Sequence, residues 1–544
     1  MAGDHQAPAA LDSAHVGDIE GAFGTLRDGA EGAAGRGTWR RRLRLLLLIM
    51  GPGLIVMGGG NDAGGIETYS QAGQHYGMAL LWTLVLLFPI LFLNQEMVVR
   101  LGAVSGVGHA RLIFERFGRF WGAFSVTDLL VINAVTLVTE FIGISQALSF
   151  FGLPRYAAVV LTAVLLFVVL AGRTYRYWER FLIALVIVNF LTFPMIFLVH
   201  ADVGTAVNGI VPQLPGGLTA NLLLFLIAVI GTTVEPWQIF FQQANIVDKR
   251  IGPRWIQYER ADLGAGILLE LLGGVAIMAA TAFGLGHTNL IGGFSDLATT
   301  AGDLSRHAGG AVGALVALAM FDGSLIGANI VGLCSTYVVG EVFKTRHSLH
   351  WKPAQAPLFY AVYAVLVLIS AAVVLLPGDL LGLIVEAVAA LNGVLLPATI
   401  VFLLLLANDR AVLGPWVNRP WQNVVTGVVV WCLVALSLAT TATYLFPDLP
   451  LTDLEIGLLA AAGIGLAGGA VVWWLQARAA VSPETWGPDA RVDLAHARAT
   501  WRTPPPETLP RPRLSPLRRA GLLTLRGYIL VAVALLVVKI VSLV

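Results

Sequence analysis

Charged residues are scarce in this sequence. Asp, Glu, Lys and Arg make up only 12% of the 544 residues, whereas apolar residues make up 57%. A soluble domain of ordinary composition carries about twice that share of charge. The composition therefore excludes an ordinary soluble protein and indicates that lipid surrounds most of the chain.

Net charge and cysteine are also nearly absent. The formal net charge is +1, so no excess positive field exists to neutralise nucleic-acid phosphates. The two cysteines, Cys334 and Cys432, lie in apolar stretches, which leaves neither a disulfide framework nor a CxxC metal site. We expect no nucleic-acid partner, no cofactor and no enzymatic chemistry.

Long apolar runs are what the sequence has in quantity. From Arg40 onward, runs of about 17 or more residues recur, each long enough to cross ~30 Å of hydrocarbon as a helix. We expect twelve spans, near 43–77, 79–102, 120–150, 156–172, 181–200, 219–246, 263–286, 308–343, 357–377, 379–407, 422–446 and 456–477.

The two ends of the chain have a different composition. Residues 1–38 are polar and rich in Gly and Ala, which predicts a disordered cytoplasmic tail. A Pro/Arg-rich linker at 479–518 is expected in the cytoplasm and precedes an extra C-terminal apolar helix at 519–544.

The positions of Lys and Arg predict the orientation. With the N-terminus in the cytoplasm, the predicted cytoplasmic segments hold all but three of the 34 Lys and Arg residues. The exceptions are Arg155, Arg306 and Lys539. Because cytoplasmic loops of membrane proteins retain positive charge, we expect a multi-pass protein of the cell membrane with a cytoplasmic N-terminus.

Two spans are poor continuous helices. In the first, GPGLIVMGGGNDAGG, glycines surround Asp62 at mid-membrane depth. In the sixth, Thr232 precedes Glu235 and Pro236. Glycine and proline disfavour helix continuation, so both helices should be unwound at their centres. Free carbonyls at that depth need protein, a cavity or a bound cation.

The order of the spans places these two breaks in matching positions. Spans 1 and 6 open successive blocks of five, which we expect to be inverted repeats at 39–200 and 219–410, followed by spans 11 and 12 at 420–478. Broken helices in matching positions of inverted repeats indicate a transporter's central site. Asp62 and Glu235 would meet there, and without a nearby Lys or Arg their natural counter-charge is a cation.

These residues resemble a known family. GPGLIVMGGGNDAGG is similar to the first helix of the Nramp divalent-metal transporters, whose hallmark Asp-Pro-Gly-Asn reads Asp62-Ala-Gly-Gly65 here. RLGAVSG from Arg100, TEFIG around Glu140, and GTTVEPW in place of GxTVMPH complete an ordered set of motifs over about residues 43–410. The resemblance implies an all-α membrane protein of LeuT-type fold that works by alternating access.

The departures from the family pattern favour a hard, hydrated ion. Glu235 stands where the family has a metal-binding methionine, and Gly65 stands at the hallmark asparagine, which we expect to remove a ligand and open space. The chain is thus similar to the NRAMP-related magnesium transporter branch. The family's sixth-helix histidines map onto Trp237 and Gln242, and its third-helix aspartate maps onto Leu137, which predicts transport without proton coupling.

The sequence therefore predicts a secondary transporter, functional as a monomer, for uptake of Mg²⁺ or Mn²⁺. Asp62 is the expected principal ligand and Glu235 the second. Thr232 and Gly59 are expected to offer carbonyls, and Gly65 to lie in the site. Pathway candidates are Glu67, Glu140, Trp237, Gln238 and Asn392; the family's amide ligand near Asn392 aligns with Ala389.

Three alternatives stay open at this point. A proton-coupled transition-metal transporter is one, because two neighbouring carboxylates can share a proton. An organic-solute transporter of the same fold is another, although Asp62 and Glu235 would repel a substrate carboxylate. The third is a metal sensor that does not transport.

Overall fold

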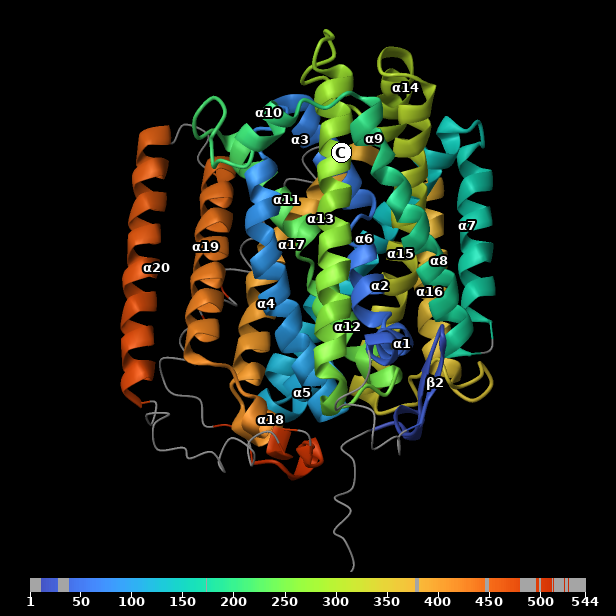
Figure 1. Ribbon diagram of the computed structural model, residues 1–544, viewed down its shortest axis with the longest axis vertical. Helices are drawn as coiled ribbons and strands as arrows, with labels where there is room; N and C mark the ends of the chain where they lie inside the picture. The colour runs from blue at the N-terminus through green and yellow to red at the C-terminus, as the bar shows by residue number, and fades with distance from the viewer. Residues whose placement is uncertain are drawn as a thin grey trace, which may run out of the picture.

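The computed structural model describes residues 11–27, 39–172, 174–376, 381–445, 450–479, 496–498, 500–510, 512, 523 and 527. These residues form a bundle of helices, with α19 and α20 standing along one side and α7 along the other (Figure 1). The only sheet in the described part of the chain is a short antiparallel hairpin near the N-terminus, in which Ile19 pairs with Leu26.

The elements of the first half run from η1 to α10. They are η1 (Ser13–His15), β1 (Ile19–Gly21), β2 (Gly24–Leu26), α1 (Trp39–Ile49), α2 (Pro52–Gly58), α3 (Ala63–Tyr76), α4 (Leu81–Ser105), α5 (His109–Phe117), α6 (Arg119–Phe150), α7 (Arg155–Leu170), α8 (Tyr175–Asn189), η2 (Phe190–Thr192), α9 (Pro194–Leu198) and α10 (Val203–Asn208).

The remaining elements run from α11 to η6. They are α11 (Ala220–Thr233), α12 (Pro236–Asp248), η3 (Pro253–Trp255), α13 (Ile256–Leu285), α14 (Leu297–His307), α15 (Gly310–Phe343), α16 (Pro357–Leu375), α17 (Leu381–Ala407), α18 (Arg410–Leu413), η4 (Gly414–Trp416), α19 (Pro420–Leu445), α20 (Leu451–Ala479) and η6 (Pro506–Thr508).

Ten helical stretches in the described chain are long and apolar enough to cross a membrane. They correspond to ten of the twelve predicted spans. The other two are shorter: α7 has 16 residues, and the first span is divided into α1, α2 and α3. The chain is therefore a multi-pass membrane protein. The extra helix predicted at 519–544 lies almost wholly outside the described residues.

The N-terminal tail departs from the prediction. We expected 1–38 to be disordered, but residues 11–27 form η1 and the hairpin and dock on the bundle. The Asp12 carboxylate accepts hydrogen bonds from the Trp351 indole at 2.8 Å and the His347 backbone N–H at 2.8 Å. The backbone N–H of Ala22 donates to Glu179 at 2.5 Å. Polar composition did not predict this order, because the segment is held by hydrogen bonds to buried polar groups of the bundle rather than by an apolar face of its own.

The packing of the bundle places the interrupted helices at its centre. α13 packs against both α2 and α3, α15 packs against α6, and α11 packs against α17. Ile55, Val56 and Met57 of α2 are fully buried within one large hydrophobic cluster. The polar residues between α2 and α3 are consequently enclosed by apolar helices rather than exposed to lipid.

Candidate functional site

The first helix is interrupted between Gly58 and Ala63. Asp62 caps the start of α3, and its Oδ1 accepts a hydrogen bond from the backbone N–H of Gly65 at 2.8 Å. The backbone N–H of Ala63 donates to Oε2 of Glu140 at 3.2 Å. In a continuous helix that N–H would bond to the carbonyl of Gly59, so the break deprives Gly59 of its helical donor.

The second interruption separates α11 from α12 at Val234 and Glu235, which are extended. Pro236 has no N–H, so the carbonyl of Thr232 also lacks its usual helical donor. Gln238 stabilises the break from within α12: its Oε1 accepts from the Glu235 N–H at 3.2 Å, and its Nε2 donates to the Thr233 carbonyl at 3.3 Å. Both predicted interruptions are thus confirmed.

Three carboxyl groups meet between the breaks. The Asp62 carboxyl lies within hydrogen-bonding range of both Glu140 of α6 and Glu235, and all three side chains are buried. Among the described residues, none of the ion pairs involves these carboxyls, and no basic group stands among their main electrostatic neighbours. Within the described residues, the three carboxyl groups therefore lack a Lys or Arg partner, so their negative charge is balanced by bound protons or by a cation.

Asn392 belongs to this cluster. Its Nδ2 donates to Oε1 of Glu235 at 2.8 Å, and its Oδ1 is buried without a hydrogen-bond partner. Ala389, one helical turn earlier on α17, lies beside Gly64: a Cβ added to Gly64 would be 4.0 Å from that of Ala389 and 3.1 Å from Oγ1 of Thr232. α17 therefore supplies an amide to the site even though the aligned position is an alanine.

Gly65 corrects an expectation. We expected the missing asparagine to open space, but a Cβ at Gly65 would lie 2.6 Å from the Gly60 carbonyl oxygen. The backbone of the break folds over this position, so the absence of a side chain permits the tight turn and leaves no cavity. At Gly59 a side chain would likewise meet Ile330 of α15.

The other pathway candidates are all buried, but they lie in different surroundings. Glu67 is enclosed in α3, and Trp237 at the start of α12 is buried, with an indole nitrogen that has no hydrogen-bond partner. Gln238 and Glu270 of α13 both lie beside the first break, because a Cβ added to Gly60 would be 3.1 Å from Nε2 of Gln238 and closer still to Oε1 of Glu270. Sequence reasoning missed the hydrogen bond of 2.7 Å between the Tyr69 hydroxyl and Oγ1 of Thr233, which ties α3 to α11; no local pattern marks such a pair.

No group of three or more His, Cys, Asp and Glu side chains within the described ranges is arranged to hold a metal ion. A cation beside Asp62 would therefore take part of its coordination from carbonyl, hydroxyl, amide or water oxygens. Such oxygen ligands are present in the carbonyls of Gly59 and Thr232, the Thr232 hydroxyl and the Asn392 amide. This donor set suits hard cations.

Comparison with known proteins decides the family. The model of the Nramp family, described as natural resistance-associated macrophage protein-like, matches residues 53–443. The chain belongs to the Nramp family. Two bacterial relatives named divalent metal cation transporter MntH, from Burkholderia ambifaria and Ralstonia nicotianae, are 28% and 27% identical to this Nramp protein. The alignments cover 75% and 73% of this chain and 92% and 89% of theirs, respectively.

A solved structure gives the same fold. The manganese transporter of Eremococcus coleocola superposes with a TM-score of 0.60 at 20% sequence identity, over 85% of this chain and 97% of that one. The expected helical LeuT-type fold of the Nramp transporters is confirmed. The boundaries predicted for the two repeats stay a prediction.

Proposed function

We propose that this Nramp protein is a secondary transporter that takes up divalent metal cations, Mg²⁺ or Mn²⁺, by alternating access. The observation that carries the proposal is the meeting of Asp62, Glu140 and Glu235 between two helix breaks, without a basic partner. Buried carboxyl groups at membrane depth are costly unless a cation or protons compensate them. The names of the MntH relatives and of the manganese transporter support the same class of cargo.

The ligands and the ion preference follow from the donor atoms. Asp62 is the principal ligand, Glu235 the second, and the carbonyls of Gly59 and Thr232 complete an oxygen-rich site next to Gly65. Oxygen donors without a thioether favour Mg²⁺ and Mn²⁺ over softer ions. This supports placing the chain near the magnesium-transporting branch of the family.

The domain arrangement and topology form part of the proposal. Residues 39–200 and 219–410 form the two inverted halves, and one bundle of helices rocks against the rest around the central site. The protein acts as a monomer in the cell membrane with its N-terminus in the cytoplasm. An organic-solute transporter would need a partner for a substrate carboxylate, and a sensor would bind metal without flux.

Proton coupling is the point on which two candidates differ. Leu137, Trp237 and Gln242 replace ionisable residues of the family pattern, which favours uncoupled transport. The contact among three carboxyl groups favours the second candidate, a proton-coupled transition-metal transporter. Such a cluster holds at least one proton when empty, because like charges raise the free energy of the fully ionised state, and a divalent cation would displace that proton.

Flux into liposomes tests both candidates. The purified chain should admit Mg²⁺ or Mn²⁺, and Asp62→Ala and Glu235→Ala should lower uptake by more than the ~10-fold typical of losing an outer-shell partner. Asp128→Ala, on α6 well away from Glu140, is the matched control and should keep parental uptake. A pH dye inside the liposomes reports coupling: metal uptake without a pH change supports the uncoupled mechanism, and metal-dependent acidification supports proton-coupled uptake, in which protons enter with the metal. Uptake unaffected by Asp62→Ala would rule out the site.

A further inference from the structure

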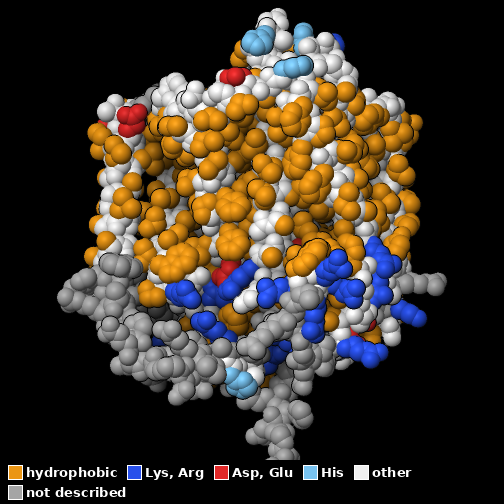
Figure 2. All heavy atoms as spheres, viewed as in Figure 1, with side chains coloured by type: hydrophobic (Ala, Val, Ile, Leu, Met, Phe, Trp, Pro, Cys, Tyr) orange, Lys and Arg blue, Asp and Glu red, His pale blue; other side chains and the backbone are white. Residues whose placement is uncertain are grey.

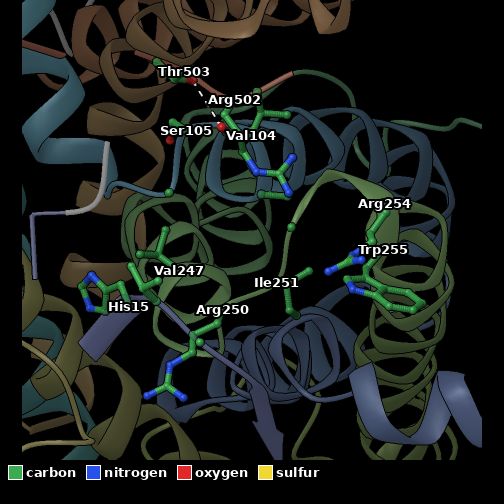
Figure 3. A pocket seen from close by; sticks show the side chains of 15 residues that line it. His15, Val104, Ser105, Val247, Arg250, Ile251, Arg254, Trp255, Arg502 and Thr503 are labelled. Carbon is green, nitrogen blue, oxygen red and sulfur yellow. Dashed lines mark hydrogen bonds between the residues drawn. The ribbon is translucent and has the colours of Figure 1, made fainter. Parts of the chain in front are cut away.

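A cavity of about 210 Å³ lies at the end of the bundle where α4 leads into α5, away from the carboxyl cluster. Four separate segments line it: residues 15–17 of the docked N-terminal segment, 103–106 at the end of α4, the stretch 247–255 between α12 and α13, and residues 502–503 near the C-terminus (Figure 3). One water molecule needs about 10–15 Å³ of such space, so the cavity holds several waters or a phosphate group.

The lining is basic. It includes Arg250, Arg254 and Arg502, and none of the described lining residues is Asp or Glu. The guanidinium groups of Arg254 and Arg502 are directed toward the middle of the cavity, whereas that of Arg250 points away (Figure 3). All three arginines also make contacts within the protein: Arg250 pairs with Glu20 at 3.7 Å, Arg502 donates to the Trp501 carbonyl at 3.1 Å, and the Arg254 guanidinium lies 5.5 Å from the centre of the Trp255 ring. A cleft lined by charge of one sign concentrates counter-ions.

The position of Arg502 is set by the fold. The hydroxyl of the next residue, Thr503, donates to the Val412 carbonyl at 2.7 Å, and its backbone N–H donates to the Val104 carbonyl at 3.3 Å, which fastens the C-terminal segment to α18 and α4. A Cβ at Gly252 would be 3.2 Å from Nη2 of Arg502, so the glycine lets this guanidinium approach the α12–α13 loop. A charged group held in place before its ligand arrives binds with a smaller entropic cost.

We propose that this cavity binds a phosphate group, with Arg254 and Arg502 as the contacting cations. Guanidinium groups match phosphate oxygens in charge and in hydrogen-bond geometry. Because the walls come from both terminal segments and from two loops of the bundle, the bound group joins parts of the chain that are distant in sequence. The source is either a soluble phosphate or the headgroup of an anionic lipid, which present the same chemistry.

Titration of the purified full-length chain with inorganic phosphate tests the site, with chloride at equal ionic strength as the reference. Arg254→Gln and Arg502→Gln should each weaken phosphate binding about tenfold or more, the usual loss for a charged hydrogen bond. Arg498→Gln is the matched control: its guanidinium bonds to the Pro415 carbonyl and lies outside the cavity lining. Parental thermal unfolding without phosphate identifies variants that remain folded, and Arg502→Lys should retain more affinity than Arg502→Gln.

Nanodiscs distinguish the two sources. If phosphatidic acid in the nanodisc reduces phosphate binding relative to phosphatidylcholine alone, the site takes a lipid headgroup; equal binding in both indicates a soluble phosphate. The proposal is overturned if the parent shows no phosphate binding above chloride, or if Arg498→Gln loses as much affinity as the two cavity variants.

Discussion

At the scale of single residues, the site depends on groups that orient one another. Glu235 has one carboxyl oxygen held by Asn392 at 2.8 Å, and its other oxygen is buried without a hydrogen-bond partner. Asp62 is held similarly by the Gly65 N–H. Each carboxylate therefore has one oxygen fixed by the protein, an arrangement that leaves capacity for a ligand while restricting the rotamer.

Asn392→Ala should weaken metal binding by ~10-fold or more, because outer-shell partners that orient a ligand have effects of that size. Calorimetric titration with Mn²⁺ measures the change. Asn133→Ala is a suitable control, since Asn133, about two helical turns before Glu140 on α6, makes a comparable buried hydrogen bond of 3.0 Å to Ser335. Equal affinities in Asn392→Ala and the parent would show that the amide plays no part in the site.

At the scale of elements, the interruption between α11 and α12 depends on a proline. Pro236 begins α12 and cannot donate to Thr232, whereas Pro397 lies inside α17, which stays helical. A proline alone is therefore insufficient for an unwound segment. At the α11–α12 junction two further features maintain the unwound segment. Val234 and Glu235 are extended, and Gln238 forms hydrogen bonds with the backbone of Glu235 and Thr233.

Pro236→Ala should stabilise a continuous helix and slow metal uptake about fivefold, because the restored N–H competes for the Thr232 carbonyl and a helical bond is worth ~1 kcal/mol. Initial uptake rates in liposomes provide the measurement. Pro397→Ala serves as the control and should leave uptake near the parental rate. The prediction fails if both substitutions slow transport alike.

The docked N-terminal segment contains a pH-dependent contact. Burial lowers the pKa of His15 to about 4, although the nearby Asp248 carboxylate acts in the opposite direction. Asp12, His347 and His350 also face His15. An undocked histidine takes up a proton near pH 6.5, whereas the docked one stays neutral until about pH 4, so docking weakens as the pH falls through this window.

A spin label at Phe23→Cys, in a Cys432→Ser background, should accordingly become more mobile between pH 7.5 and 5. Phe23 is 49% exposed, so the label itself leaves the hairpin contacts in place. His15→Gln removes the titrating group and should abolish most of the change. A label that is equally mobile at both pH values in the parent would contradict the prediction.

At the scale of the whole molecule, positive charge is distributed unequally between the two ends of the helix bundle. Lys and Arg side chains gather at one end of the apolar band on the face shown in Figure 2. The α15–α16 loop, with Lys344 and Arg346, belongs to the predicted cytoplasmic side, and His287 lies in the α13–α14 loop at the other end. Retention of positive charge in the cytoplasm predicts which end faces inward.

Cysteine labelling tests this orientation. In intact cells, with Cys432→Ser as background, His287→Cys should react with a membrane-impermeant thiol reagent and Arg346→Cys should react only after permeabilisation. Both native side chains are exposed, so the reaction of each cysteine depends only on whether it faces the outside or the inside of the cell. The reverse pattern would place the N-terminus outside.

The sequence by itself determined the membrane class, ten of the twelve predicted spans and both helix interruptions. These properties depend on local composition: apolar run length fixes what can cross lipid, and the glycines around Asp62 and the Glu235-Pro236 pair act on their own helical bonds.

Only the tertiary structure decided which side chains share the site. That Glu140 and Asn392 reach the two breaks depends on the rotation and packing of α6 and α17, and no local pattern specifies either. Tertiary contacts also decided two other outcomes. The N-terminal segment is ordered by bonds to distant residues such as Glu179, and the space beside Gly65 is filled by the folded-back carbonyl of Gly60.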